Sequence, residues 1–277
     1  MIFVTGATGR VGSRLIQSLL KAGQPVRGLV RDPQKAHRLR LPKSSEVVGD
    51  LENLLVWESA LQGCDRLVSI PPNTFHQAAQ EIRLFQAAER AGIQHIVKLS
   101  SVKAQLDSPC HFFQQHAIAE QALKQSGLPF TILQSNSFVQ NFLWFRDEIQ
   151  TQGTLSLPLG NSQVAPIDIK DVVAVIGVVL NGGHEGAIYN LTGPERLTMT
   201  TVTQILANVM GRTICYVDTA PAEFEQRLIQ AGVPEWYAGA IAAAWQVARE
   251  GVPTVTDAVY QLTRVQPTSF AEFASFL

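Results

Sequence analysis

The chain has 277 residues, of which 46% are hydrophobic and 16% are charged. This composition excludes a disordered protein, and the length fits one large domain or a main domain with a smaller lobe. Lysine and arginine total 22 against 23 acidic residues, and the resulting net charge of −1 argues against general binding to nucleic acid or anionic membranes.

Three cysteines, Cys64, Cys110 and Cys215, show no metal-ligand spacing. We expect free thiols in a reducing compartment and therefore a cytoplasmic protein. The first six residues read as a strand and a turn, so no signal peptide is expected. The longest apolar run, 172–180, is shorter than the roughly 20 residues that cross a bilayer, so no membrane partner is expected.

Apolar strand-like runs alternate with helical periodicity through the first half of the chain. The patterns predict strands at 2–5, 25–30, 45–48, 65–70, 94–99 and 130–133, and helices at 13–22, 54–61, 77–91 and 113–125. Because parallel neighbours need a crossover between them, this alternation predicts an α/β fold with a Rossmann-type, doubly wound parallel sheet.

The alternation ends after about residue 150. Segments 164–167 and 187–191 are expected strands that flank a helix over 171–180, so parts of 163–195 should return to the main sheet. Asp168 and Asp171 read as a turn and a cap for that helix. We therefore predict a nucleotide-binding domain over 1–152 and a smaller C-terminal substrate-binding lobe over 153–277.

The strongest local signal is the turn TGATGRVG at 5–12, between the first strand and the first helix. Gly6 permits the tight turn, Gly9 lets backbone N–H groups approach a pyrophosphate, and Gly12 lets the helix pack closely on the strand. The phosphates would lie at the positive end of the helix dipole. The spacing is G-x-x-G-x-x-G rather than G-x-G-x-x-G, but the strand–turn–helix context favours a dinucleotide over a purely structural turn.

The residues after the second strand bear on the choice between NADP and NAD. Arg31 is the first residue beyond that strand, where a guanidinium can bind a 2′-phosphate, and Arg10 is a second candidate. Alternatively, Asp32 can bond the ribose hydroxyls of NAD. A third interpretation is that Arg31 and Asp32 form only a solvated turn. Asp50, after the third strand, can bond the adenine amine or cap the next helix.

Eight segments carry a family resemblance: TGATGRVG at 5–12, VRGLVRDP at 26–33, VVGDL at 47–51, HIVKLSS at 95–101, SGLPFTILQSNSFVQNF at 126–142, PIDIKDVVA at 166–174, YNLTGPERLT at 189–198 and VTDAVYQL at 255–262. Together they resemble the NmrA-like group of atypical short-chain dehydrogenases/reductases over nearly the whole chain. The resemblance implies NADP(H) in a cleft between a Rossmann domain and a smaller lobe. Similar members include quinone, triphenylmethane-dye and ergot-alkaloid-type imine reductases, and the founding member is a regulator that binds dinucleotide.

The turn and the resemblance together imply a set of cofactor-binding residues at the strand ends: Gly6, Thr8, Gly9, Arg10, Val11, Gly12, Arg31, Asp50, Leu51, Ile70, Pro71 and Ser100. The resemblance places Asn136, Phe138 and Asn141 against the nicotinamide and the substrate. A core aromatic residue and two loop amides are an equally good reading of these three positions.

Typical short-chain dehydrogenases use a tyrosine and a lysine four residues apart, and none of the four tyrosines here has a lysine four residues later. By resemblance, His116 takes the position of the catalytic lysine of isoflavone-reductase-like enzymes, and Ser100 lies beside the expected nicotinamide. His116 could act as an acid at neutral pH and pair with Glu120 one helical turn later, or it is a polar residue that lines the cleft. The histidines show no metal-ligand spacing, so no metal is expected.

We therefore expect an NADPH-dependent oxidoreductase that transfers hydride to a quinone, dye, imine or similar conjugated acceptor. Such acceptors do not need a strong protein acid, and the cofactor supplies the reactive chemistry. The alternative is a non-catalytic NADP(H)-sensing regulator of the NmrA type that acts through a protein partner. A small-molecule substrate is expected, nucleic acid is not, and a homo-oligomer is left open.

Overall fold

The computed structural model describes residues 1–32, 34, 39, 41–42, 45–49, 54–251 and 254–276. Asp50 and Leu51, which were predicted to bind the cofactor, lie outside the described residues. All three cysteines are free thiols, as expected, and only Cys215 is exposed. No helix within the described ranges is long and apolar enough to cross a membrane.

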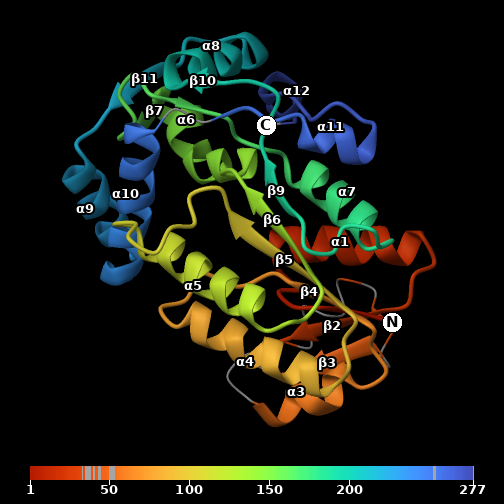
Figure 1. The fold of residues 1–277 in the computed structure, drawn as a ribbon. Helices are drawn as coiled ribbons and strands as arrows, with labels where there is room; N and C mark the ends of the chain where they lie inside the picture. The colour runs from red at the N-terminus through yellow and green to blue at the C-terminus, as the bar shows by residue number, and fades with distance from the viewer. Residues whose placement is uncertain are drawn as a thin grey trace.

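Among the described residues, seven parallel strands form the main sheet in the order β3-β2-β1-β4-β5-β6-β9 (Figure 1). This confirms the predicted Rossmann-type sheet. Its strands are β1 (Ile2–Val4), β2 (Val26–Val30), β3 (Glu46–Val48), β4 (Arg66–Ser69), β5 (His95–Ser101), β6 (Phe130–Ser135) and β9 (Ile188–Leu191). Strands are added in opposite directions from β1 and β4, so the carboxyl ends of these two strands border the crevice where ligands of such sheets bind.

Helices cover both faces of the sheet (Figure 1). One face carries α1 (Arg10–Lys21), α7 (Ile169–Val179) and α11 (Ala258–Thr263), and the other carries α3 (Leu54–Leu61), α4 (Gln77–Arg90) and α5 (His111–Gln125). Side chains alternate along β5, so Val97 belongs to the core below α1 and α7 whereas Ile96 belongs to the core below α4 and α5. By this alternation Lys98 and Ser100 face α4 and α5.

A smaller lobe with its own apolar core lies beyond the carboxyl ends of β5 and β6 (Figure 1). Its elements are η2 (a 3-10 helix, Val139–Phe145), α6 (Arg146–Gln152), β7 (Thr154–Leu157), β8 (Gln163–Val164), β10 (Leu197–Thr198), α8 (Met199–Met210), β11 (Cys215–Asp218), α9 (Pro221–Gln230), α10 (Glu235–Glu250) and α12 (Phe270–Ala274). The carboxylate of Asp171 on α7 accepts hydrogen bonds from the backbone N–H and the hydroxyl of Thr268, at 2.7 and 3.0 Å, just before α12. Asp168 caps α7 by accepting the N–H of Lys170, as predicted.

Several predicted element boundaries were wrong. Helix α1 begins at Arg10 rather than at 13, because Gly9 already has the extended backbone of an N-cap. Strands β5 and β6 run on to Ser101 and Ser135, since their parallel pairing continues to those residues. The strand expected at 164–167 is shorter and lies elsewhere: β8 pairs antiparallel with β10, outside the main sheet.

Candidate active site

A cavity of about 770 Å³ lies between the carboxyl ends of the main strands and the lobe. Its described lining begins at the glycine turn and continues past the ends of β4, β5 and β6 to α10 of the lobe. The cavity therefore follows the crevice that the strand order predicts. It is large enough for a cofactor and a small molecule together.

The glycine turn has the close backbone packing that a phosphate-binding turn requires. Gly6 has φ +59°, and a Cβ there would lie 2.5 Å from the carbonyl oxygen of Ile70 at the end of β4. A Cβ on Gly12 would collide with the carbonyl oxygen of Gly6. Helix α1 has no side-chain cap and no acidic residue in its first turn. Its first N–H groups are therefore available to an anion, and the turn fits the diphosphate of NADP(H).

Arg31, Asp32 and Arg10 have different positions relative to the cavity. Arg31 is exposed and lines the cavity immediately after β2. Asp32 is absent from the described lining, and its carboxylate accepts the backbone N–H of Gln34 at 2.9 Å. Arg10 lines the cavity but donates to the carbonyl oxygen of Gln140 at 3.0 Å and lies over the ring of Trp144. Of the two arginines, only Arg31 lies at the end of β2, where the 2′-phosphate was expected.

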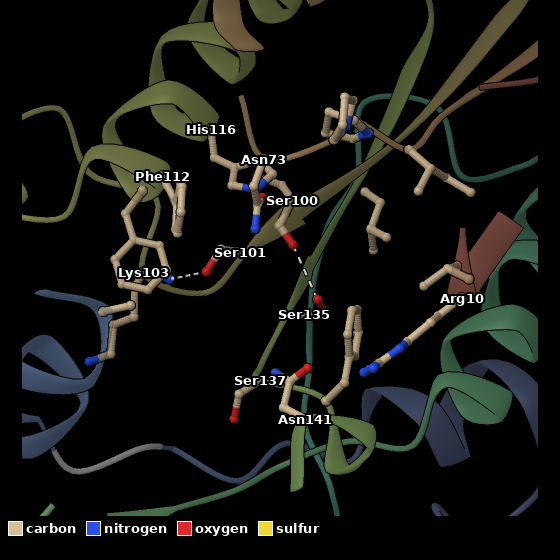
Figure 2. A pocket seen from close by; sticks show the side chains of 18 of the residues that line it. Arg10, Asn73, Ser100, Ser101, Lys103, Phe112, His116, Ser135, Ser137 and Asn141 are labelled. Atoms are coloured by element: carbon tan, nitrogen blue, oxygen red, sulfur yellow. Dashed lines mark hydrogen bonds between the residues drawn. The ribbon is translucent and has the colours of Figure 1, made fainter. Parts of the chain in front are cut away.

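The centre of the cavity is polar. Figure 2 shows Asn73 and His116 on one side, Ser137 and Asn141 on the other, and Ser100 and Ser135 between them. The Ser135 hydroxyl donates to the carbonyl oxygen of Ser100 at 3.2 Å, which ties β6 to β5 at this point. The remaining predicted site residues in the described chain, apart from Gly12, also line the cavity: Gly6, Thr8, Gly9, Val11, Ile70, Pro71, Asn136 and Phe138.

The predicted pairing of His116 with Glu120 was wrong. Glu120 is buried and accepts hydrogen bonds from the Ser100 hydroxyl at 2.6 Å and from the Gln134 side-chain amide at 2.9 and 3.0 Å. His116 is instead held by Gln77 of α4, whose Nε2 lies 3.1 Å from His116 Nδ1. Sequence spacing placed His116 and Glu120 on one helix face, but hydrogen-bond donors on β5 and β6 attract the carboxylate more strongly than the ring does.

His116 is neutral at pH 7. Burial, helped by the nearby Lys98 ammonium, holds the pKa of His116 well below its usual 6.5. The ring can donate or accept a hydrogen bond, but it does not carry the proton of an imidazolium at neutral pH. This differs from the expectation of a histidine with an ordinary pKa.

The lobe contributes an apolar wall that sequence reasoning missed in large part. Five cavity residues lie on one face of α10: Tyr237, Ile241, Ala244, Trp245 and Ala248. Their spacing of three, four or seven residues is the helical signal that could have identified this wall. Across from them lie further missed residues on α5, on η2 and after β5: Phe112, Phe113, Trp144 and Lys103. The wall suits a flat, largely apolar ligand.

Ionisable side chains in the described lining are few. They are Arg10, Arg31, Lys103, His116 and Tyr237, with no carboxylate among them. No group of three histidine, cysteine, aspartate or glutamate side chains in the described chain is placed to hold a metal ion. The chemistry of the cavity therefore depends on hydrogen bonds, cations and aromatic surface.

The model of the NmrA-like family matches residues 1–274. The chain belongs to the NmrA-like family. It is 32% identical over 276 residues to the NAD(P)H azoreductase of Xenophilus azovorans, covering 99% of this chain and 96% of that protein. This confirms the resemblance found from the sequence segments.

Two similar solved structures contain the predicted cofactor. The NADPH-dependent quinone oxidoreductase of Escherichia coli, complexed with NADPH, matches with a TM-score of 0.91 at 28% identity over 100% of this chain and 99% of that chain. The triphenylmethane reductase of Citrobacter sp., complexed with NADP(H), matches with a TM-score of 0.88 at 26% identity over 100% and 99%. The prediction of NADP(H) agrees with both.

Proposed function

We propose that this protein is an NADPH-dependent reductase that transfers hydride to a flat, conjugated small molecule such as a quinone, an azo compound or a dye. The observation that carries the proposal is the continuous cavity that joins the glycine turn to the aromatic face of α10. One end fits a dinucleotide, and the other fits an aromatic acceptor. The named reductases among the relatives support the same reading.

Different residues along the cavity bind different parts of the cofactor and the acceptor. The glycine turn and the first turn of α1 bind the diphosphate, and Arg31 binds the 2′-phosphate. NADPH, when bound, supplies the hydride. Asn136 and Asn141 orient the reacting groups with amide hydrogen bonds, and the Ser100 hydroxyl, whose proton goes to Glu120, accepts a hydrogen bond from them. Phe138 and the α10 wall exclude water and stack against the acceptor.

His116 acts as a neutral hydrogen-bond donor rather than as a strong acid. The cavity lacks a tyrosine with a lysine four residues later, which typical short-chain dehydrogenases use to protonate a substrate oxygen. Conjugated acceptors spread the negative charge that arrives with the hydride, so a neutral donor is sufficient and water can supply the proton. This chemistry favours conjugated acceptors over ordinary ketones.

The same proposal assigns nucleotide binding to the main sheet and its helices, predicted as 1–152, and substrate selection to the lobe, predicted as 153–277. The packing moves η2 and α6 into the lobe and α7, β9 and α11 onto the main sheet. Its test is turnover: the purified protein is incubated with NADPH and a panel of a quinone, an azo dye, a cationic triphenylmethane dye and a simple aliphatic ketone. We expect NADPH oxidation above the protein-free rate with at least one conjugated acceptor and none with the ketone.

Calorimetric titration with NADPH and NADH accompanies the turnover assay. Tight NADPH binding without turnover of any acceptor contradicts the reductase and supports the non-catalytic NADP(H) sensor. Absence of heat with both dinucleotides contradicts both functions, because each needs a bound dinucleotide.

A further inference from the structure

A buried polar network lies behind His116. Lys98 Nζ lies 2.7 Å from each carboxylate oxygen of Glu81, and the two side chains are 0% and 3% exposed. The Ser69 hydroxyl also donates to Glu81, at 2.9 Å. Gln77 Nε2 donates to Glu81 Oε2 at 3.3 Å and faces His116 Nδ1 at 3.1 Å. These contacts connect a buried ion pair to a ring that lines the cavity.

Glu81 decides the orientation of the Gln77 amide. A carboxylate only accepts hydrogen bonds, so the end of the amide that faces it must be the NH2 group. A reversed amide would place two oxygen atoms 3.3 Å apart with no proton between them. The present orientation holds even though Gln77 Oε1 is buried without a hydrogen-bond partner among the described residues. The Gln77 atom that meets His116 is therefore a donor.

A donor that faces Nδ1 requires a lone pair on Nδ1, so a neutral ring carries its proton on Nε2. The buried charged groups on the elements around His116 are Glu81 on α4, Lys98 on β5 and Glu120 on α5. Glu81 and Lys98 form an ion pair, and Glu120 is occupied by Ser100, Gln134 and the ammonium of Lys124. No described carboxylate is therefore left to pair with a protonated ring, and the surroundings favour the neutral form.

We propose that Gln77 is a positioning residue that holds His116 as the neutral Nε2–H tautomer, so that His116 presents a hydrogen-bond donor to the substrate. The role of this donor rests on the proposed reductase function, but the tautomer itself does not. When a hydride adds to a conjugated acceptor, an electron pair moves onto the acceptor's heteroatom, and the Nε2–H stabilises that charge. His116 keeps its proton, and water donates the proton that the reduced acceptor takes up. The ring therefore does not have to be reprotonated between turnovers.

The test is nitrogen NMR of isotope-labelled protein, with His116→Gln to assign the ring signals. We expect a proton on Nε2 and a bare Nδ1, unchanged between about pH 6 and 8. Gln77→Met keeps a similar volume but removes the N–H, so we expect the Nδ1–H tautomer to appear. In that variant kcat should fall about 10-fold, because a misdirected donor loses part of its effect on the transition state, while KM for NADPH stays unchanged.

Gln115→Met is the matched control. Gln115 neighbours His116 on α5 and accepts the backbone N–H of Ala78 at 2.9 Å, so the control removes a similar α4–α5 contact without touching the ring. We expect unchanged His116 signals and unchanged kcat in this variant.

Three results would overturn the positioning role: a wild-type proton on Nδ1, a protonated ring at pH 7, or a Gln77→Met variant with an unchanged tautomer. If Gln77→Met does not fold, the wild-type spectrum alone tests which ring nitrogen of His116 carries the proton. A wild-type protein with the Nε2–H tautomer but no turnover contradicts the reductase function and supports the tautomer assignment. The two failures are therefore distinguishable.

Discussion

Arg31 is the single residue on which the choice of NADP over NAD depends. It lines the cavity directly after β2, whereas the neighbouring carboxylate of Asp32 is taken up by the backbone of Gln34. An acidic residue in this place would bond the ribose of NAD, so the contact of Asp32 with Gln34 and its absence from the described lining weaken the main feature that favoured NAD.

We predict that Arg31→Ala raises KM for NADPH by about 10- to 100-fold, since it removes charge-assisted hydrogen bonds to the 2′-phosphate. KM for NADH should stay within about twofold, because NADH lacks that phosphate. Asp32→Asn is the control and should change neither constant. Steady-state kinetics with both cofactors checks this, and an equal loss for NADPH and NADH would show that Arg31 supports the loop rather than the phosphate.

At the scale of elements, α10 forms the substrate side of the cavity. Its lining residues share one face, while the adjacent Trp236 is 42% exposed, is absent from the described lining, and packs on Phe75 and on the lining residue Phe112. Two tryptophans on one helix therefore differ in position, and this difference provides a matched pair of substitutions.

We predict that Trp245→Ala raises KM for an aromatic acceptor about 10-fold and leaves KM for NADPH unchanged, because it removes stacking area at the lobe end only. Trp236→Ala should have a clearly smaller effect, because Trp236 reaches the cavity only through its contact with Phe112. Kinetics with a quinone checks the pair. Equal effects of both substitutions would show that α10 acts through its packing and not through contact with the acceptor.

Local patterns were enough to predict the parts of the site that depend on neighbouring residues in the chain. The glycine turn, Arg31 and the parallel sheet follow from spacing and from the crossover rule, and the structure brings the turn and Arg31 to one cavity. The partners of His116 could not be predicted this way. Gln77 is separated from it by 39 residues, and Glu120 is drawn away by donors on two strands. Such choices depend on which groups the tertiary fold brings together.

For the whole molecule, two histidines that fold in the neutral state make stability depend on pH. His95 is buried with its Nε2 2.9 Å from the Thr131 hydroxyl, and burial lowers its pKa below 6.5. Burial also lowers the pKa of His116 well below that value. In the unfolded chain both rings regain an ordinary pKa near 6.5.

The direction of the pH effect on stability follows from the number of protons that the folded and the unfolded states bind. Below about pH 6.5 the unfolded chain binds protons at both histidines while the folded protein does not, so acid favours unfolding. The contribution of the two neutral histidines to the free energy of unfolding is at its maximum above about pH 6.5. It falls as the pH drops, by at most about 1.4 kcal/mol per pH unit for each histidine. We therefore predict that Tm changes little between about pH 7.5 and 7 and then decreases increasingly steeply down to about pH 5.5, a range that lies above the ordinary pKa of carboxyl groups.

Differential scanning calorimetry at constant ionic strength checks this prediction, with variants that separate the two rings from the rest of the protein. His116→Gln keeps a polar side chain but cannot titrate, so its Tm should fall less steeply with acid than that of the wild type. His76→Gln serves as the control, since His76 is exposed, and its slope should equal that of the wild type. A wild-type Tm that rises on acidification would mean that the folded protein takes up protons more readily than the unfolded chain. That result would contradict neutral rings at both positions and, with them, the neutral tautomer proposed for His116.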